Sequence, residues 1–454
     1  MGGGSVKDDS RISALHSAAS MANRRSAIAE HGPRLAGAER AALAVLAAGT
    51  LVIPTVLGAG ADRFRLPKEL AFRAEAVVLL ALALFFLTGR HRTWTVRMRP
   101  AFIVAAAIIC WTLVTVAAST NRQLSVDSLI TVVAAVVIFV ATCLAAQTTS
   151  LVAVDVLMVA CCANAVLVLL QALKIWNPFP VSYYAGVALL GNPNDVGTFL
   201  VTPAVVALVL AVVTSSVKRR TIYAGIAVLL VAGVLASGTR TAVIAFVAGV
   251  VIFALGQGRH AALAAAAVLA IVFLGLSRPS TTIGRGARNL VEAARSRDYQ
   301  HLFSERLLPF LAALDMTRDH PLLGTGPGCF KYQYMTYRVA LRDRYPKEWT
   351  RGWPMNWGEV HNDHLQVAAE TGLPGYALFL AAIGVAAGIV GRARRRTDAA
   401  TPEATFARAL RWPLATVVFV VCLAQFPLEL AAPRLMLLTL GALCITWDRD
   451  DAAA

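Results

Sequence analysis

Two histidines stand in the segment His361-Asn362-Asp363-His364-Leu365. On a helix, His361 and His364 are three residues apart and share one face. Because an imidazole with a pKa of about 6.5 can deprotonate a hydroxyl near neutral pH, the segment favours a general base. A metal site is a second interpretation, although the spacing is not that of H-E-x-x-H and no further His or Cys cluster joins it. Histidines at a membrane interface without a chemical role are a third.

Basic residues form the second candidate set, and Arg240 is the most informative because it stands alone between two apolar runs. A guanidinium group binds phosphate through two parallel hydrogen bonds and keeps its charge, which suits a diphosphate at the headgroup level. Ordinary contact with lipid phosphates is the alternative for any single arginine. The other members of the set are Arg306, in a long polar segment, and Arg63, Arg65 and Lys68, between two apolar runs.

The third candidate is the segment Gly191-Asn192-Pro193-Asn194-Asp195, which opens an apolar run. Asn and Pro favour turns, so a structural turn is the default interpretation. Polar side chains at this level could also hold a sugar or a phosphate. We therefore keep Asn192, Asn194 and Asp195, together with Asn362 and His364, as candidate substrate-binding residues.

The elements that must position these candidates are apolar runs of about twenty residues, which is the length that a bilayer-spanning helix requires. The chain has 454 residues, of which 57% are hydrophobic and 15% are charged, and most runs lack the polar stripe of a soluble helix. The pattern predicts an all-α integral membrane protein with about twelve transmembrane helices. The expected spans are 40–60, 72–89, 100–119, 128–147, 151–173, 196–215, 221–238, 241–256, 261–277, 374–391, 412–429 and 433–447. Only Ser237–Thr241 separates the seventh from the eighth, and a tight turn is expected there because an arginine inside a continuous spanning helix is costly.

Charge in the short loops orients the bundle. With the N-terminus inside, most Lys and Arg residues of these loops fall on the inner face, so the positive-inside rule predicts an inner-membrane protein with both termini cytoplasmic. Orientation explains much of the net charge of +16, and we do not expect nucleic acid as a partner. The expected domains are a basic tail (1–39), spans one to nine (40–277), a periplasmic loop domain with the His361 helix (278–373), three further spans (374–447) and a cytoplasmic tail (448–454).

The loop domain is expected to be mostly helical. Its amphipathic stretch, Leu302–Met316, contains Pro309, where a helix starts or kinks. A short helix from His361 to Glu370 should break at Thr371–Gly375, because an unbroken helix to Gly391 would be about 46 Å long, too long for the bilayer alone. His361 is therefore expected at or above the outer interface.

These segments, in this order, resemble the bacterial O-antigen ligase family, within the O-antigen ligase/polymerase superfamily. The resemblance rests on Gly191–Asp195, Ser237–Thr241, Arg306, His320–Gly326 and His361–Leu365 with the following Glu370–Gly375. It implies an inverting glycosyltransferase, independent of metal and cofactor, that moves O-antigen glycan from undecaprenyl diphosphate to lipid A–core in the periplasm during lipopolysaccharide biosynthesis.

Carried over by position, the resemblance implies that His361 is the catalytic histidine and that Arg240 and Arg306 bind the diphosphate. His364 stands where the family often has an aromatic residue such as Tyr. The sequence leaves open an O-antigen polymerase or a protein O-oligosaccharyltransferase that uses the same donor. A secondary transporter is the alternative from another class, but Asp155 is the clearest acid inside a span and the two halves of the chain do not look alike.

Overall fold

The computed structural model describes residues 41–59, 62–87, 98–147, 149–179, 186–256, 282–351, 355–388 and 401–447, with scattered positions between 263 and 278. The regular elements of these residues are helices, and the chain is an all-α membrane protein. The expected tails 1–39 and 448–454 and most of the ninth expected span lie outside the described residues.

Among the described residues, seven helices are long and apolar enough to cross a membrane. Each overlaps one of the expected spans. They are α3 (Arg99–Ala117), α4 (Arg122–Ala145), α5 (Val152–Ala172), α6 (Pro193–Val213), α7 (Val217–Ser237), α15 (Asp363–Ala386) and α16 (Pro402–Cys422). Three further apolar helices are shorter, namely Ala41–Val52, α8 (Arg240–Gly256) and α17 (Ala431–Trp447). The helix α2 (Arg65–Leu87) begins seven residues before the expected second span, and the total of twelve spans stays a prediction.

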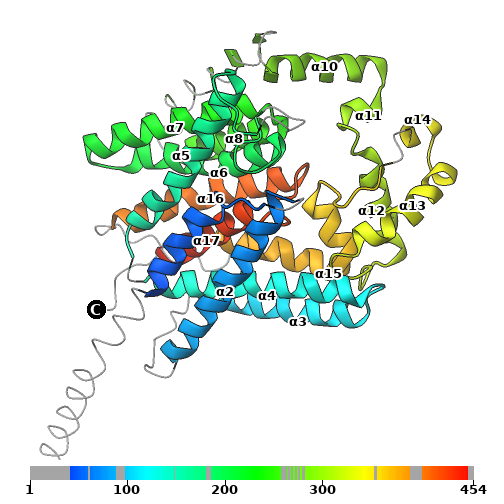
Figure 1. Ribbon diagram of the computed structural model, residues 1–454, viewed down its shortest axis with the longest axis horizontal. Coiled ribbons are helices and arrows are strands. Elements are labelled where there is room, and N and C mark those ends of the chain that lie inside the picture. Colours follow the sequence, from blue (N-terminus) through cyan, green and yellow to red (C-terminus); the bar gives the residue numbers. More distant parts are fainter. Residues whose placement is uncertain are drawn as a thin grey trace, which may run out of the picture.

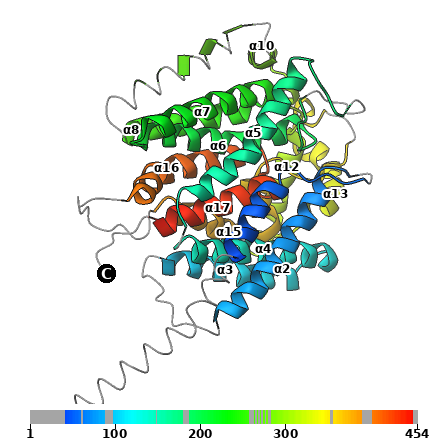
Figure 2. The ribbon, with the colours of Figure 1, turned by 60° about the vertical axis from the view of Figure 1, so that its left-hand side comes forward.

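The bundle has three tiers (Figures 1 and 2). The helices α5, α6, α7 and α8 form one outer tier, α2, α3 and α4 form the other, and α15, α16 and α17 lie between them. The helix α6 is buried from Asp195 to Leu210, which is typical of a helix that is apolar on every side. Gly233 lets α7 approach α6 closely, since a Cβ there would lie 2.9 Å from a methyl carbon of Leu200.

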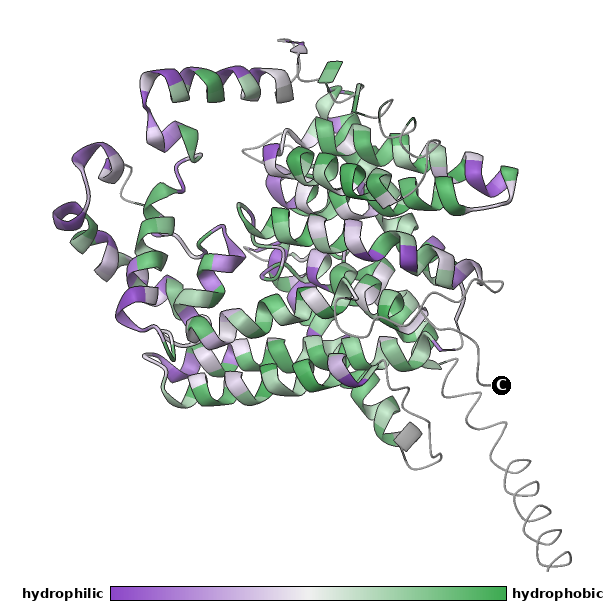
Figure 3. Ribbon diagram, turned by 180° about the vertical axis from the view of Figure 1, so that it is seen from behind, coloured by the Kyte–Doolittle hydropathy of each residue, from purple (hydrophilic) through white to green (hydrophobic). Residues whose placement is uncertain are grey.

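A smaller helical unit stands at one end of the bundle, where it is more polar than the bundle itself (Figures 1 and 3). Its helices are α10 (Thr282–Ser296), α11 (Tyr299–Leu302), α12 (Leu307–Asp319), α13 (Phe330–Arg344) and α14 (Lys347–Thr350). It has an apolar core of its own, in which Leu308 and Leu311 pack with Phe330 and Tyr334. The expected amphipathic helix is present, and it begins at Leu307, so that Pro309 falls in its first turn.

Two breaks expected from glycine and proline are confirmed. Gly238 ends α7 in the left-handed conformation, and α8 begins at Arg240, so the two spans are separate helices. Gly372 interrupts α15 with φ 72° and ψ 177°, a conformation open almost only to glycine. The helix therefore consists of a short segment after Asn362 and a spanning segment after the break.

Candidate functional site

His361 lies just ahead of α15 and not inside a helix, which corrects the expectation of a helix starting at this residue. Its φ of 59° is uncommon for a residue other than glycine, and the helix starts at Asp363 after the cap Asn362. Because His361 is outside the helix, it does not share a helical face with His364. The residue at this position is not glycine, so the left-handed backbone conformation could not be predicted from the local sequence.

Aromatic rings hold the His361 imidazole from two sides. The ring centroid of Trp357 lies 5.1 Å away and that of Phe426 lies 4.4 Å away, both in edge-to-face geometry. The Nδ1 atom of His361 is buried and has no hydrogen-bond partner among the described residues. Burial, together with the positive charges of Arg306 and Arg65, lowers the pKa of His361 to about 2. The imidazole is therefore neutral near pH 7, which is the form that accepts a proton.

Arg306 connects the loop unit to the end of the bundle. It precedes α12, it is nearly buried, and one of its guanidinium nitrogens donates a 2.7 Å hydrogen bond to the Ala424 carbonyl oxygen. Burial and the nearby charge of Arg240, opposed by Asp195, lower the pKa of Arg306 to about 10. Arg240 itself donates to the Ser304 hydroxyl at 2.6 Å. The guanidinium groups of Arg240 and Arg306 are therefore close enough to repel each other, and an anion bound there would relieve this repulsion.

Arg65 is the third basic group of the site. It forms ion pairs with Asp195 and Glu359, both at 3.2 Å, and its guanidinium carbon lies 5.2 Å from the ring centroid of Phe426. Of the expected residues, the structure therefore brings together His361, Arg240, Arg306, Arg65 and Asp195. Glu359 was missed by the sequence reasoning, although an acid two residues before the histidine was a usable signal.

Two of the asparagines serve as helix caps. The Asn192 side chain accepts from the Asn194 backbone N–H at 2.8 Å and caps α6. The Asn362 side chain accepts from the Leu365 N–H at 3.0 Å and caps α15. These contacts fit the turn interpretation, so a substrate-binding role for Asn192, Asn194 and Asn362 stays a prediction.

The other expected residues lie at the edge of the site or away from it. Arg63 is exposed. Lys68 is buried and donates to the Val56 carbonyl oxygen at 2.6 Å, and burial lowers the pKa of this lysine to about 8. His364 Nε2 lies 3.0 Å from the Phe419 carbonyl oxygen and Nδ1 lies 3.3 Å from the Tyr376 hydroxyl. Both ring nitrogens of His364 are thus engaged between α15 and α16, which is typical of a structural histidine.

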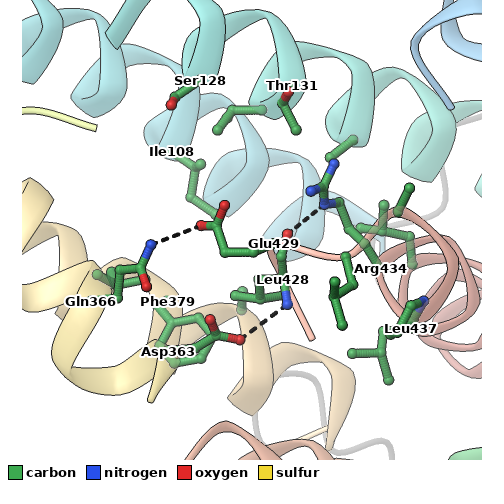
Figure 4. A pocket seen from close by; sticks show the side chains of 18 of the residues that line it. Ile108, Ser128, Thr131, Asp363, Gln366, Phe379, Leu428, Glu429, Arg434 and Leu437 are labelled. Carbon is green, nitrogen blue, oxygen red and sulfur yellow. Dashed lines mark hydrogen bonds between the residues drawn. The ribbon is translucent and has the colours of Figure 1, made fainter. Parts of the chain in front are cut away.

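The segment Leu423–Leu430, called here the α16–α17 loop, was not expected at all. The apolar run from 412 to 429 predicted a span, but α16 ends at Cys422 and a turn follows. Asp363 Oδ2 accepts from the Leu428 N–H at 3.0 Å, and Gln366 donates to Glu429 at 3.3 Å, as Figure 4 shows. The start of α15 therefore holds the loop that supplies Ala424 to Arg306 and Phe426 to His361.

A cavity of about 690 Å³ lies beside the site, between α2, α3, α4, α15, α16 and α17 (Figure 4). Its polar part includes Arg65, Asp195 and Glu359, which it shares with the site. Its apolar part runs between the helices past Ile108 and Leu437. His361, Arg240 and Arg306 do not line it, so the cavity adjoins the site through the Arg65 ion pairs and does not contain the histidine.

Residues 225–380 match a family model described as O-Antigen ligase. The matched segment contains Arg240, Arg306 and His361 and runs from α7 through the loop unit into α15. The match supports membership of the O-antigen ligase superfamily. No match was found among the curated proteins.

Proposed function

We propose that this member of the O-antigen ligase superfamily transfers O-antigen glycan from undecaprenyl diphosphate to the lipid A–core oligosaccharide. One observation carries the proposal above the others. Arg240 and Arg306 approach each other next to a neutral, partly buried His361, which supports the proposal of an anion site beside a base. A diphosphate leaving group and an acceptor hydroxyl are the two reactants that such a pair serves.

The arginines would bind the donor diphosphate and stabilise it as it departs. Charge builds on the leaving oxygen in the transition state, and two guanidinium groups placed there in advance neutralise it without reorganisation. Arg306 is held by Ala424 and Arg240 by Ser304, so both donors are positioned before the substrate arrives. This arrangement can take the role that a metal ion has in other glycosyltransferases, and we propose no cofactor.

His361 would act as the general base. The acceptor hydroxyl oxygen attacks the anomeric carbon, the bond from that carbon to the diphosphate oxygen breaks with its electron pair, and the hydroxyl proton goes to the imidazole. A single displacement of this kind inverts the anomeric configuration. Because Arg306 and Arg65 lower the pKa of His361, a bound diphosphate that offsets their charge would raise it. The histidine would thus become a stronger base only when the donor is present.

We place this reaction at the periplasmic surface of the inner membrane, with both termini cytoplasmic and about twelve spans. Support comes from the distribution of Lys and Arg among the short loops and from the seven helices that are able to span a membrane. The loop unit carries Arg306 at the start of α12, and the charge of Arg306 acts on His361. Residues 278–373 are proposed to form the periplasmic domain.

Reconstituted transfer tests this function. The full chain in lipid nanodiscs would receive undecaprenyl-diphosphate glycan and, in separate reactions, lipid A–core, a second lipid-linked glycan or a pilin-type protein acceptor, all with EDTA. We expect glycan on lipid A–core and undecaprenyl diphosphate as the second product. Elongation of the second lipid-linked glycan would instead indicate a polymerase, modified protein would indicate an O-oligosaccharyltransferase, and no transfer to any acceptor would refute the proposal.

A further inference from the structure

The α16–α17 loop (Leu423–Leu430) contacts both the base and the anion site. The carbonyl oxygen of Ala424 holds the Arg306 guanidinium at 2.7 Å. Two residues later, the Phe426 ring packs edge-to-face on His361 at 4.4 Å and beneath the Arg65 guanidinium at 5.2 Å. One short loop thus fixes three charged or titratable groups of the site relative to one another.

This loop is anchored from outside the site. Asp363 accepts from the Leu428 N–H at 3.0 Å and Gln366 donates to Glu429 at 3.3 Å (Figure 4). The Phe426 ring is 1% exposed, whereas the His361 residue is partly exposed and its Nδ1 atom is buried. Phe426 therefore covers part of the imidazole, while the residue keeps some exposed surface.

We propose that Phe426 is a positioning residue, which holds the His361 ring against Trp357 and keeps water from the part of the ring that it covers, so that the imidazole stays neutral. The proposal rests on the proposed function insofar as it assigns His361 to proton transfer. It adds a residue outside the matched segment, on a loop that no motif in the sequence pointed to.

The charged groups around His361 set the direction of the expected effect. Arg65 from α2 and Arg306 ahead of α12 both disfavour a proton on the imidazole, and Arg240 from α8 acts on Arg306. Glu359 and Asp195 face Arg65 and reduce its influence. Removing the Phe426 ring leaves these charges in place and lets water solvate the imidazolium. The midpoint of His361 protonation should therefore rise toward the ordinary value of about 6.5.

The test compares Phe426→Ala with Phe406→Ala in the full chain in nanodiscs. Phe406 is equally buried, but it packs on Trp447 at the far end of α16 and α17, so its loss creates a similar hole away from the site. Two quantities are measured between pH 5 and pH 7.5. One is the transfer rate, and the other is the rate at which diethyl pyrocarbonate, which acylates neutral imidazole, labels His361, read by mass spectrometry.

For Phe426→Ala we expect both rates to fall four- to tenfold at pH 5 relative to pH 7.5, because a midpoint of about 5.5–6 leaves about a quarter to a tenth of the imidazole neutral. The unsubstituted chain and Phe406→Ala should show little change over this range. A loss of transfer by the same factor at every pH, with unchanged labelling of His361, would overturn the proposal. Phe426→Leu provides a second variant if the alanine variant fails to fold, with a smaller shift in the same direction.

Labelling also separates the two proposals. It reports the protonation of His361 whether or not glycan is transferred. An unsubstituted chain without transfer refutes the proposed function, whereas identical labelling profiles in the Phe426 variants and the unsubstituted chain refute the positioning role alone.

Discussion

Gly372→Ala should destabilise the junction between the loop unit and the bundle. At Gly372, φ is 72° and ψ is 177°, and an added Cβ would lie 2.1 Å from the Leu322 carbonyl oxygen. The clash would be between the added Cβ and a backbone oxygen, so no side-chain rotation relieves it. The Leu373 N–H donates to the Pro321 carbonyl oxygen at 2.8 Å. The clash would therefore occur where backbone hydrogen bonding joins α15 to the loop unit.

The size of the effect follows from two contributions. A residue with a side chain in this region of backbone space costs about 1–3 kcal/mol. Forcing an extra carbon into a packed contact adds about 1–3 kcal/mol. The free energy of unfolding should therefore fall by about 2–6 kcal/mol. Transfer should fall as well, because the short segment before the break follows Asn362 and positions His361.

Gly225→Ala is the matched control. Gly225 lies inside α7 and an added Cβ would meet no atom of the described residues within 4 Å, so the substitution should be neutral or stabilising by about 1 kcal/mol. The assay is reversible unfolding of the purified variants in mixed micelles of mild detergent and SDS, followed by tryptophan fluorescence. If Gly372→Ala unfolded at the same SDS fraction as Gly225→Ala, the reasoning from the Gly372 backbone would be refuted.

Three further outcomes are expected. Glu370 accepts from the N–H groups of Gly328 and Phe330 at 2.8 and 3.0 Å, so Glu370→Gln leaves one of them without an acceptor and should cost about 1–3 kcal/mol in the same unfolding assay. Arg240→Lys loses the planar fork that binds phosphate, and kcat should fall about 10²-fold, whereas near-normal turnover would indicate a lipid anchor. Because the unfolded chain protonates His361 below a pH of about 6.5 while the folded chain resists until about pH 2, stability should fall with decreasing pH in this window. His361→Phe should reduce that slope by up to about 1.4 kcal/mol per pH unit.

Sequence reasoning predicted the helical class and the breaks because both follow from local signals. Apolar runs of bilayer length identify spanning helices, and glycine at positions 238 and 372 identifies the ends of helical segments. The grouping of Arg240, Arg306 and His361 on one side followed from the order of the spans. Their convergence did not, because it depends on how α8, α12 and α15 pack.

What the sequence missed lies in non-local contacts. The α16–α17 loop contains Gln425, Pro427 and Glu429, but most of it was assigned to the span expected from 412 to 429. Its turn and its contacts with Arg306 and His361 were therefore not predicted. The engagement of His364 depends on the Phe419 carbonyl of another helix, which no spacing within one segment can indicate. The left-handed backbone conformation of His361 could not be predicted from the residue type. In each case the missing information is a tertiary contact.

Replacement of His361 by alanine in the reconstituted reaction tests the account most directly. The full chain, His361→Ala and the control His320→Ala, at an exposed histidine after α12, would be compared with saturating undecaprenyl-diphosphate glycan and lipid A–core in EDTA. A positioned general base contributes about 10²–10⁴-fold, so His361→Ala should lose transfer by that factor while remaining folded and binding the donor. His320→Ala should keep the full rate. Transfer by His361→Ala at the rate of the unsubstituted chain would contradict the assignment of His361 as the base.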